Sequence, residues 1–184
     1  MDCDGVLCDF TGGVYDWFGV DREEWPKPGK PDIDNRIRDM IGVPVNVFWK
    51  SLTYDFWMNL HPTDFGRRIW YPLHDWLDSG RDLFILTNPV GRDSIQARQD
   101  WIREHIGPSW VRKTIFCGPK FVCANPDSIL VDDLEKNVDL FRAAGGHAVL
   151  VPQPWNSLHD FEGDKAEYVL QQVKLIIEKG EGNG

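Results

Sequence analysis

Paired carboxylates stand beside short apolar runs at two distant places in this chain. Asp2 and Asp4 lie at its start, and Asp132 and Asp133 directly follow the apolar residues 129–131. Acids that meet at the ends of buried strands repel one another and lose solvation unless a cation balances them. Carboxylate oxygens are ligands that suit Mg²⁺. The pattern therefore predicts a fold in which strand ends converge on a magnesium ion.

Four short apolar runs without strict alternation are typical of strands that are covered on both faces of a parallel sheet. These runs span residues 83–87, 114–117, 129–131 and 147–151. Helical patterns separate them, at about residues 64–80, 92–105, 134–144 and 164–178. Alternating strands and helices predict an α/β fold with a doubly wound parallel sheet, whose ligands bind beyond the carboxyl ends of the strands.

Residues 15–62 break this alternation. They contain a Pro/Gly-rich stretch at 25–31 and then several aromatic residues. We expect a mainly helical cap, inserted after the first strand into a single domain of 184 residues. The glycine-rich end, residues 180–184, is predicted to be a disordered tail.

A hydroxyl, an amide and an ammonium group accompany the acids. Thr87 and Asn88 end the strand-like run 83–87, and Lys120 lies in the loop before the run 129–131. These groups can donate hydrogen bonds to a phosphate and neutralise its charge. Together with the acids, they predict a site for a phosphate ester.

The order of these motifs resembles that of the haloacid dehalogenase (HAD) superfamily of phosphohydrolases: Asp-x-Asp-Gly-Val, then strand-Thr, then Lys, then strand-Asp-Asp. Residues 2–10, 56–60 and 86–89 are similar to the 5′(3′)-deoxyribonucleotidase branch, which includes phage and bacterial members. The resemblance implies a Rossmann-like core with a small cap and the hydrolysis of phosphate monoesters.

The resemblance also implies a role for each acid. Asp2 would attack phosphorus and form an aspartyl-phosphate, and Asp4 would act as general acid and then as general base. Mg²⁺ would be held by Asp2, by the main-chain carbonyl of Asp4, and by Asp133 or Asp132. The phosphate would be bound by Thr87, Asn88 and Lys120. A structural alternative is that Asp132 and Asp133 only cap the helix that follows them.

The start of the chain departs from the family pattern, because only Met1 precedes Asp2. Family members carry several apolar residues there, so we expect either a truncated start or an unusually short first strand. The α-amino group, with an ordinary pKa of about 8, would then lie close to Asp2 and could pair with it.

The aromatic residues of the cap bear on the choice of substrate. Phe18, Trp49, Phe56 and Trp57 could stack on a nucleobase. The alternative is that these rings build the core of the cap, because large apolar side chains fill small cores efficiently. The segment 152–156, after the last strand-like run, is expected to be a rigid loop, with a contact to the site as the alternative.

Composition limits the partners. The net charge of −9 disfavours stable binding to nucleic acid, and no run approaches the roughly 18 apolar residues of a membrane helix. The four cysteines form no metal-binding pattern and are expected to be reduced thiols, with a zinc site as the alternative. We expect a cytoplasmic protein that acts on a small molecule, and the aromatic cap could support a homodimer.

The favoured hypothesis is a Mg²⁺-dependent phosphomonoesterase that acts on nucleoside or deoxynucleoside monophosphates. The alternatives are a phosphatase of another small ester, a 3′-end phosphatase of nucleic acid, a phospho-accepting receiver-like domain, and a non-catalytic binding protein. Receiver domains place their acid pair before a single phosphorylated Asp, whereas the Asp-x-Asp motif comes first here.

Overall fold

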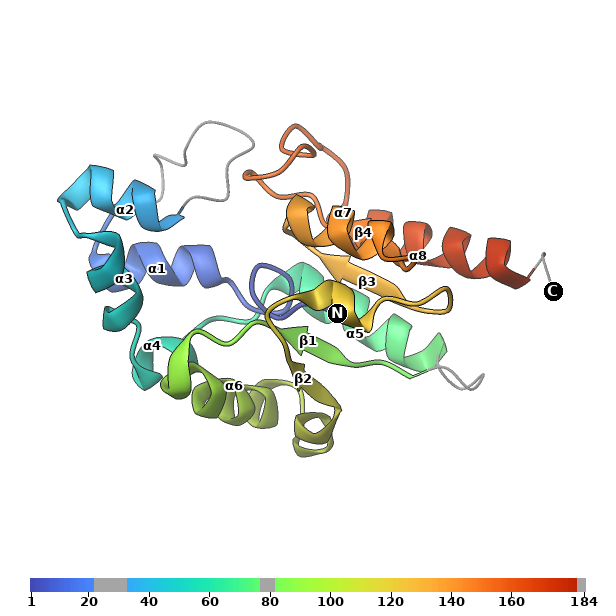
Figure 1. Cartoon of the computed structure of the whole chain (residues 1–184), viewed down its shortest axis with the longest axis horizontal. Helices are drawn as coiled ribbons and strands as arrows, with labels where there is room; N and C mark the ends of the chain where they lie inside the picture. Colours follow the sequence, from blue (N-terminus) through green and yellow to red (C-terminus); the bar gives the residue numbers. More distant parts are fainter. Residues whose placement is uncertain (22–32, 77–81, 182–184) are drawn as a thin grey trace.

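Helices and short strands alternate along most of the chain in the computed structural model, which describes residues 1–21, 33–76 and 82–181 (Figure 1). The fold is mixed α/β. In chain order the elements are α1 (Phe10–Phe18), α2 (Ile33–Ile41), α3 (Val45–Ser51), α4 (Tyr54–Met58), α5 (Asp64–Asp75), β1 (Ile85–Thr87), α6 (Gly91–His105), η3 (Pro108–Lys113), β2 (Thr114–Phe116), η4 (Lys120–Cys123), β3 (Ile129–Asp132), α7 (Glu135–Ala143), β4 (His147–Leu150) and α8 (Lys165–Glu181).

The four predicted strands are present and form two parallel pairs, β1 with β2 and β3 with β4. The first two residues of the chain lie between these pairs. The Met1 amino group donates to the Phe84 carbonyl and the Leu86 N–H donates to the Met1 carbonyl, both at 2.8 Å. On the other side, the Asp2 N–H donates to the Val131 carbonyl at 2.8 Å. Asp2 is therefore anchored beside the carboxyl end of β3.

Alternate residues of β1, β3 and β4 pack into two different apolar clusters. One cluster contains Leu86, Leu130, Ala148 and Leu150 with Val138 and Phe141 of α7. The other contains Ile85, Val131 and Val149 with Ile69 and Leu73 of α5 and Val169 and Val173 of α8. Since successive side chains of a strand point to opposite faces, these strands are covered on both faces, as predicted. In β2 the side chain of Ile115 is exposed.

Two predicted helix ends differ from the observed ones. The prediction for 64–80 is met by α5, which ends at Asp75, and residues 77–81 lie outside the described part of the chain. The predicted tail is wrong for Gly180 and Glu181, which continue α8. This helix is extended because Ile176 and Ile177 near its end still pack against the core. Residues 182–184 are not described.

The described part of 15–62 is mainly helical, in agreement with its aromatic pattern. Helices α1 to α4 gather at one end of the molecule (Figure 1), and α4 packs against α6. Helix α1 begins earlier than expected, at Phe10, because the Asp9 carboxylate accepts a hydrogen bond from the Gly12 N–H at 2.9 Å and caps the helix. The Pro/Gly-rich stretch 25–31 lies outside the described residues.

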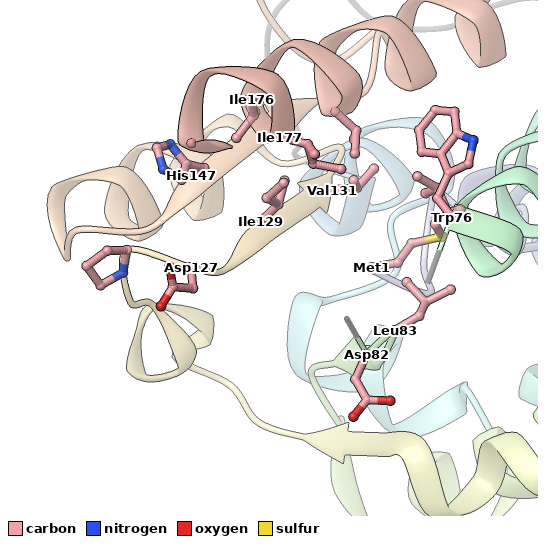
Figure 2. Close-up of a pocket in the computed structure, with 14 residues that line it drawn as sticks. Met1, Trp76, Asp82, Leu83, Asp127, Ile129, Val131, His147, Ile176 and Ile177 are labelled. Carbon is pink, nitrogen blue, oxygen red and sulfur yellow. The ribbon is translucent and has the colours of Figure 1, made fainter. Parts of the chain in front are cut away.

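An apolar groove of about 570 Å³ runs along the amino ends of β1 and β3, beside Met1 (Figure 2). Its walls include Ile129 and Val131 of β3 and Ile176 of α8. The Met1 amino group is buried, which lowers its pKa to about 6. The group donates to the Phe84 carbonyl, and the charge of Asp2 opposes the fall in its pKa. The expected ion pair with Asp2 is not among those that the described residues form. Of the helices described, none is both long and apolar enough to cross a membrane.

Helix α5 approaches the N-terminal loop closely at a glycine, which gives a test of the fold. A Cβ atom on Gly66 would lie 2.5 Å from the Val6 carbonyl oxygen and 3.1 Å from the Leu7 Cα. We expect Gly66→Ala to lower the free energy of unfolding by about 1–3 kcal/mol, despite the better helix propensity of alanine. Gly180→Ala is the matched control: nothing lies within 4 Å of its Cβ position, so stability should rise by up to about 1 kcal/mol. Urea unfolding checks both, and a stabilised Gly66→Ala variant would contradict this packing.

Candidate active site

A cavity of about 340 Å³ brings together residues that are far apart in the sequence. Asp2, Asp4 and Asp133 come from the strand ends and the loop after residue 2, whereas Trp49 and Trp57 come from α3 and α4. Seven of the residues predicted for the site line this cavity: Asp2, Asp4, Trp49, Trp57, Asn88, Lys120 and Asp133. The cavity therefore lies between the helices α1–α4 and the acidic strand ends.

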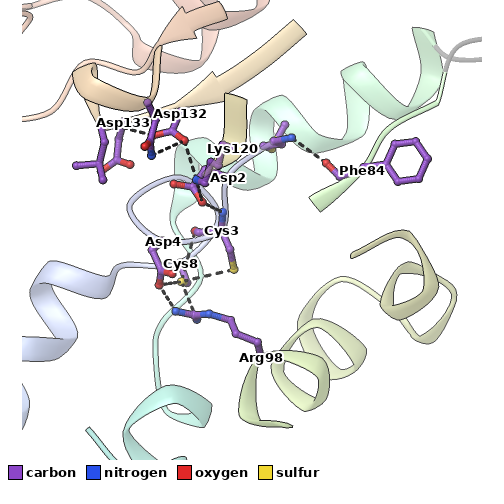
Figure 3. Close-up of polar contacts among 12 residues, drawn as sticks. Asp2, Cys3, Asp4, Cys8, Phe84, Arg98, Lys120, Asp132 and Asp133 are labelled. Atoms are coloured by element: carbon purple, nitrogen blue, oxygen red, sulfur yellow. Dashed lines mark hydrogen bonds and ion pairs between the residues drawn. The ribbon is translucent and has the colours of Figure 1, made fainter. Parts of the chain in front are cut away.

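A buried lysine links two of the acids (Figure 3). The Lys120 Nζ lies 2.6 Å from Asp2 Oδ1 and 2.7 Å from Asp132 Oδ2, and its side chain is only 3% exposed. Burial raises the pKa of Asp2 to about 7; Asp132 and Asp4 add to this rise, whereas Lys120 opposes it. Burial alone would lower the pKa of Lys120, yet the two carboxylates raise it above its usual value. One ammonium group thus faces more negative charge than it can balance.

Asp133 supplies an acid with an unused oxygen. Its Oδ2 accepts a hydrogen bond from the Trp155 indole N–H at 2.8 Å, while its buried Oδ1 has no hydrogen-bond partner among the described residues. Burial, with the neighbouring Asp132 and Asp2, raises the pKa of Asp133 well above its usual value. One oxygen each from Asp2, Asp132 and Asp133 lie within 4.8 Å of one another. This set of carboxylate oxygens fits a hard divalent cation such as Mg²⁺.

Gly5 is required by this arrangement. Its φ of +73° is in the left-handed region, and a Cβ at this position would overlap the Asp133 carboxylate. Glycine adopts this conformation without strain. The glycine after Asp4 therefore allows the N-terminal loop to pass directly against the second acidic motif.

Asp132 has a structural role in addition to its contact with Lys120. Its Oδ1 accepts from the Leu134 N–H at 2.8 Å, just before α7, and the Asn137 amide donates to both of its oxygens at 3.1 and 3.2 Å. The capping alternative is wrong in its strict form, because the N-cap residue of α7 is Leu134, which has no side-chain capping bond. Asp132 instead holds the backbone just before this helix, and it does not line the cavity. Asp133 is the member of the pair that retains an unpartnered oxygen.

Two of the three predicted phosphate-binding groups line the same cavity, whereas Thr87 is not among its lining residues. Asn88 and Lys120 line it. Thr87 ends β1 and is buried, and its hydroxyl has no hydrogen-bond partner within the described part of the chain. A buried hydroxyl without a partner is costly, so this group is available to a ligand that reaches it.

Stacked aromatic rings form one wall of the cavity. The Phe10 ring stacks with Trp49 at a centroid distance of 6.3 Å and with Trp57 at 5.5 Å, with interplanar angles of 8° and 13°. All three rings line the cavity. The Trp49 indole N–H donates to Asp34 Oδ2 at 3.0 Å, which fixes this ring further. Phe10 was missed by the sequence analysis.

Phe18 and Phe56 lie elsewhere, and their assignment to a base pocket is corrected. The Phe18 ring stacks on Phe48 at 5.4 Å, and the Phe56 side chain is only 2% exposed and packs edge-on against Phe10 and Trp57. Both rings fill the core of the helical segment, as the structural alternative proposed for the cap aromatics. Phe56 packs directly against two rings of the wall, whereas Phe18 packs against Phe48, which in turn packs against Trp49.

The loop 152–156 contacts the site, which was the alternative to a merely rigid loop. Besides the bond from Trp155 to Asp133, the Gln153 side-chain amide donates to the Gly5 carbonyl at 2.7 Å and the Asn156 amide donates to the Asp133 carbonyl at 2.9 Å. The only signal in the sequence was the position of this loop directly after the last strand. Asn137 and Arg98, both on helices, were also missed.

No protein-family model matches this chain, and no curated protein matches it. The resemblance to the HAD superfamily therefore depends on the short motifs themselves. Five of their residues, Asp2, Asp4, Asn88, Lys120 and Asp133, line one cavity. This arrangement is the basis for a functional proposal.

Trp155 gives a first test of the acidic cluster. Trp155→Phe keeps an aromatic ring but removes the indole N–H that holds Asp133 Oδ2. We expect Mg²⁺ to bind about 10-fold more weakly, because groups that orient a ligand typically contribute 10- to 100-fold to metal affinity. Trp49→Phe is the matched control, since its N–H binds Asp34 rather than an acid of the cluster. Calorimetric titration with Mg²⁺ measures both, and equal affinities for the two variants would contradict the role of Trp155.

Lys120 gives a second test. Lys120→Met leaves the buried acids without their ammonium partner, and breaking a buried ion pair typically costs about 3–5 kcal/mol. We expect this loss of stability in EDTA and a partial recovery with Mg²⁺, because a bound cation stabilises the folded state. The control is Lys113→Met, which removes an exposed pair with Asp82 and should change stability by less than about 1 kcal/mol. A Lys120→Met protein as stable as the parent in EDTA would show that the charge balance is unimportant.

Proposed function

We propose that this chain is a Mg²⁺-dependent phosphomonoesterase that acts on nucleoside or deoxynucleoside monophosphates. The observation that carries the proposal is Asp133, whose buried Oδ1 has no hydrogen-bond partner among the described residues. One of its oxygens lies within 4.8 Å of an oxygen of Asp2 and of Asp132. Cation-binding oxygens and an ammonium group on one side of a small cavity, and aromatic rings on another, suit a substrate with a phosphate end and a flat apolar end.

We propose further that the two strand pairs and residues 1–2 form one parallel sheet of the doubly wound type found in the HAD superfamily. The order would be β2, β1, residues 1–2, β3, β4. Hydrogen bonds from both neighbours to Met1 and Asp2 support this order, as does the burial of alternate strand residues in separate clusters. Asp2 would then stand at the carboxyl edge of the central strand.

The Mg²⁺ ion would be held by the carboxylates of Asp2 and Asp133 and by the main-chain carbonyl of Asp4. Asp133 is preferred over Asp132 because Asp132 is already engaged by Lys120, Leu134 and Asn137. When bound, the ion supplies positive charge that offsets the charge developing on the phosphate oxygens. It also balances the acids that Lys120 alone does not.

Each protein group at the site has a separate role in the proposed reaction. Asp2 Oδ1 is held by the Cys3 N–H at 2.7 Å and by Lys120, which leaves Oδ2 to attack phosphorus as the ester oxygen departs. Asp4 gives a proton to that oxygen and then removes one from the water that hydrolyses the aspartyl-phosphate. Thr87 and Lys120 bind the transferred phosphoryl group.

The size of the cavity and the charge of the chain favour a mononucleotide. About 340 Å³ lies near the lower end of the range for small-ligand pockets, about 300–1,000 Å³. A polynucleotide end would also need a basic surface to bind its backbone, whereas the net charge is −9. These features weigh against a 3′-end phosphatase.

The proposal is tested by phosphate release from dUMP, dTMP, AMP, a sugar phosphate and an aryl phosphate, each with Mg²⁺ and with EDTA. We expect Mg²⁺-dependent turnover of at least one nucleotide. Asp2→Asn should lower it by at least about 100-fold, whereas Asp127→Asn, at an exposed position outside the cavity, should leave it unchanged. Turnover of the aryl ester alone would contradict the nucleotide assignment, and a fully active Asp2→Asn protein would contradict the covalent mechanism.

A further inference from the structure

A second buried cation lies on the opposite side of the N-terminal loop. Arg98, on α6, is 1% exposed, and its guanidinium donates from Nη2 to Asp4 Oδ1 and from Nη1 to the Cys8 Sγ at 3.3 Å (Figure 3). Its guanidinium carbon also lies 4.7 Å from the centre of the Trp57 ring. Arg98 therefore contacts both an acid of the site and a ring of the cavity wall.

We propose that Arg98 is a positioning residue that holds Asp4 in its orientation toward the cavity and ties this orientation to Trp57. The inference rests on the proposed function, in which Asp4 transfers protons. It adds a residue that touches neither the substrate nor the phosphate and acts through Asp4.

The contacts on the Asp4 carboxylate indicate which of its two oxygens Arg98 holds. The guanidinium and the Cys8 Sγ, at 3.6 Å, both contact Oδ1. Arg98 approaches from the protein interior, because its side chain is 2% exposed while that of Asp4 is 27% exposed. With Oδ1 held from behind, Oδ2 is the oxygen presented to the cavity that Asp4 lines. Proton transfer to a leaving oxygen would then take place at Oδ2.

The surroundings of Arg98 argue against a packing role alone. Its neighbours on α6, Ala97, Trp101 and Ile102, are fully buried apolar residues. Burying a guanidinium among them costs free energy, and an apolar side chain of similar size would fill the space at lower cost. The charge is therefore explained by its partner, Asp4, rather than by the core.

The contact with Trp57 connects this pair to the substrate end of the cavity. A guanidinium over an indole ring is attracted to its face, so the position of the Trp57 ring and that of Arg98 depend on each other. A ligand that packs against Trp57 would therefore act on the group that holds Asp4. Nucleotide binding and the orientation of the proton-transfer group are linked through one side chain.

The test compares Arg98→Met and Arg98→Lys with the control Arg103→Met. Arg103 is on the same helix and makes an exposed ion pair with Asp100. A nucleotide, whose alkoxide leaving group needs a proton, is compared with an aryl phosphate, whose phenolate needs little help. For Arg98→Met we expect kcat to fall by about 100-fold on the nucleotide and by less than about 3-fold on the aryl ester. Arg98→Lys should recover part of the nucleotide rate, and Arg103→Met should resemble the parent on both.

A double-mutant cycle adds a readout that a purely structural role would not produce. If Arg98 acts through Asp4, Arg98→Met should cause little further loss in an Asp4→Asn background. Equal losses on both esters, or fully additive losses in the cycle, would overturn the proposal. Arg98→Lys supplies the same comparison should Arg98→Met fail to fold, which circular dichroism would show.

Crystal structures of the parent and of the Arg98→Lys or Arg98→Met protein test the positioning role independently of any enzymatic activity. We expect the Asp4 carboxylate to turn away from its parent orientation in the variant. An unchanged Asp4 would overturn the positioning role even in an active enzyme. If the parent hydrolyses none of the esters, the proposed function fails, and the Asp4 orientation in the two structures still decides the role of Arg98.

Discussion

The balance of buried charge around Lys120 is the constraint on which the rest of the structure depends. Asp2, Asp132 and Asp133 are all buried, and Lys120 lies within ion-pair distance of the first two. This ammonium joins η4, the start of the chain and the end of β3. Charges this deep in a protein are tolerated only when they are paired and hydrogen-bonded. The remaining acid, Asp133, has a buried oxygen without a partner among the described residues, and this is the physical reason to expect a divalent cation.

The loop from Asp2 to Cys8 separates two acids into different environments. Asp2 faces the interior beside Lys120, whereas Asp4 stands at the cavity edge with Arg98 behind it. The loop between them is held by its own backbone: the Cys8 N–H donates to the Cys3 carbonyl at 2.9 Å, and the Gly5 N–H donates to the Cys8 carbonyl at 2.8 Å. Under the proposed function, these two environments suit two different roles, Asp2 as the nucleophile and Asp4 in proton transfer.

The sequence patterns were sufficient to predict the strands, because an apolar run is a local property of the sequence. They also placed the acids at the ends of these strands, since the acids directly follow or adjoin the apolar runs. They were not sufficient for Arg98 or Trp155. A charged residue in an amphipathic helix normally faces water, so nothing local marks Arg98 as buried against Asp4. Trp155 depends on how a loop folds back over β3, which is a tertiary property. The same limit explains Phe18, since periodicity does not show whether a ring faces a cavity or Phe48.

The aromatic wall explains why two interpretations of the cap aromatics, as core residues and as a binding surface, do not exclude each other. Phe10 stacks with Trp49 and Trp57, so each ring that lines the cavity is also a ring that holds the helical segment together. A change in this segment that moves the rings would alter the shape of the cavity, whereas the strand ends would keep their acids. Under the proposed function, substrate selection would therefore depend on residues of α1 to α4, and the chemistry on the strand ends. Arg98, which contacts Trp57 and Asp4, is the side chain at which these two parts meet.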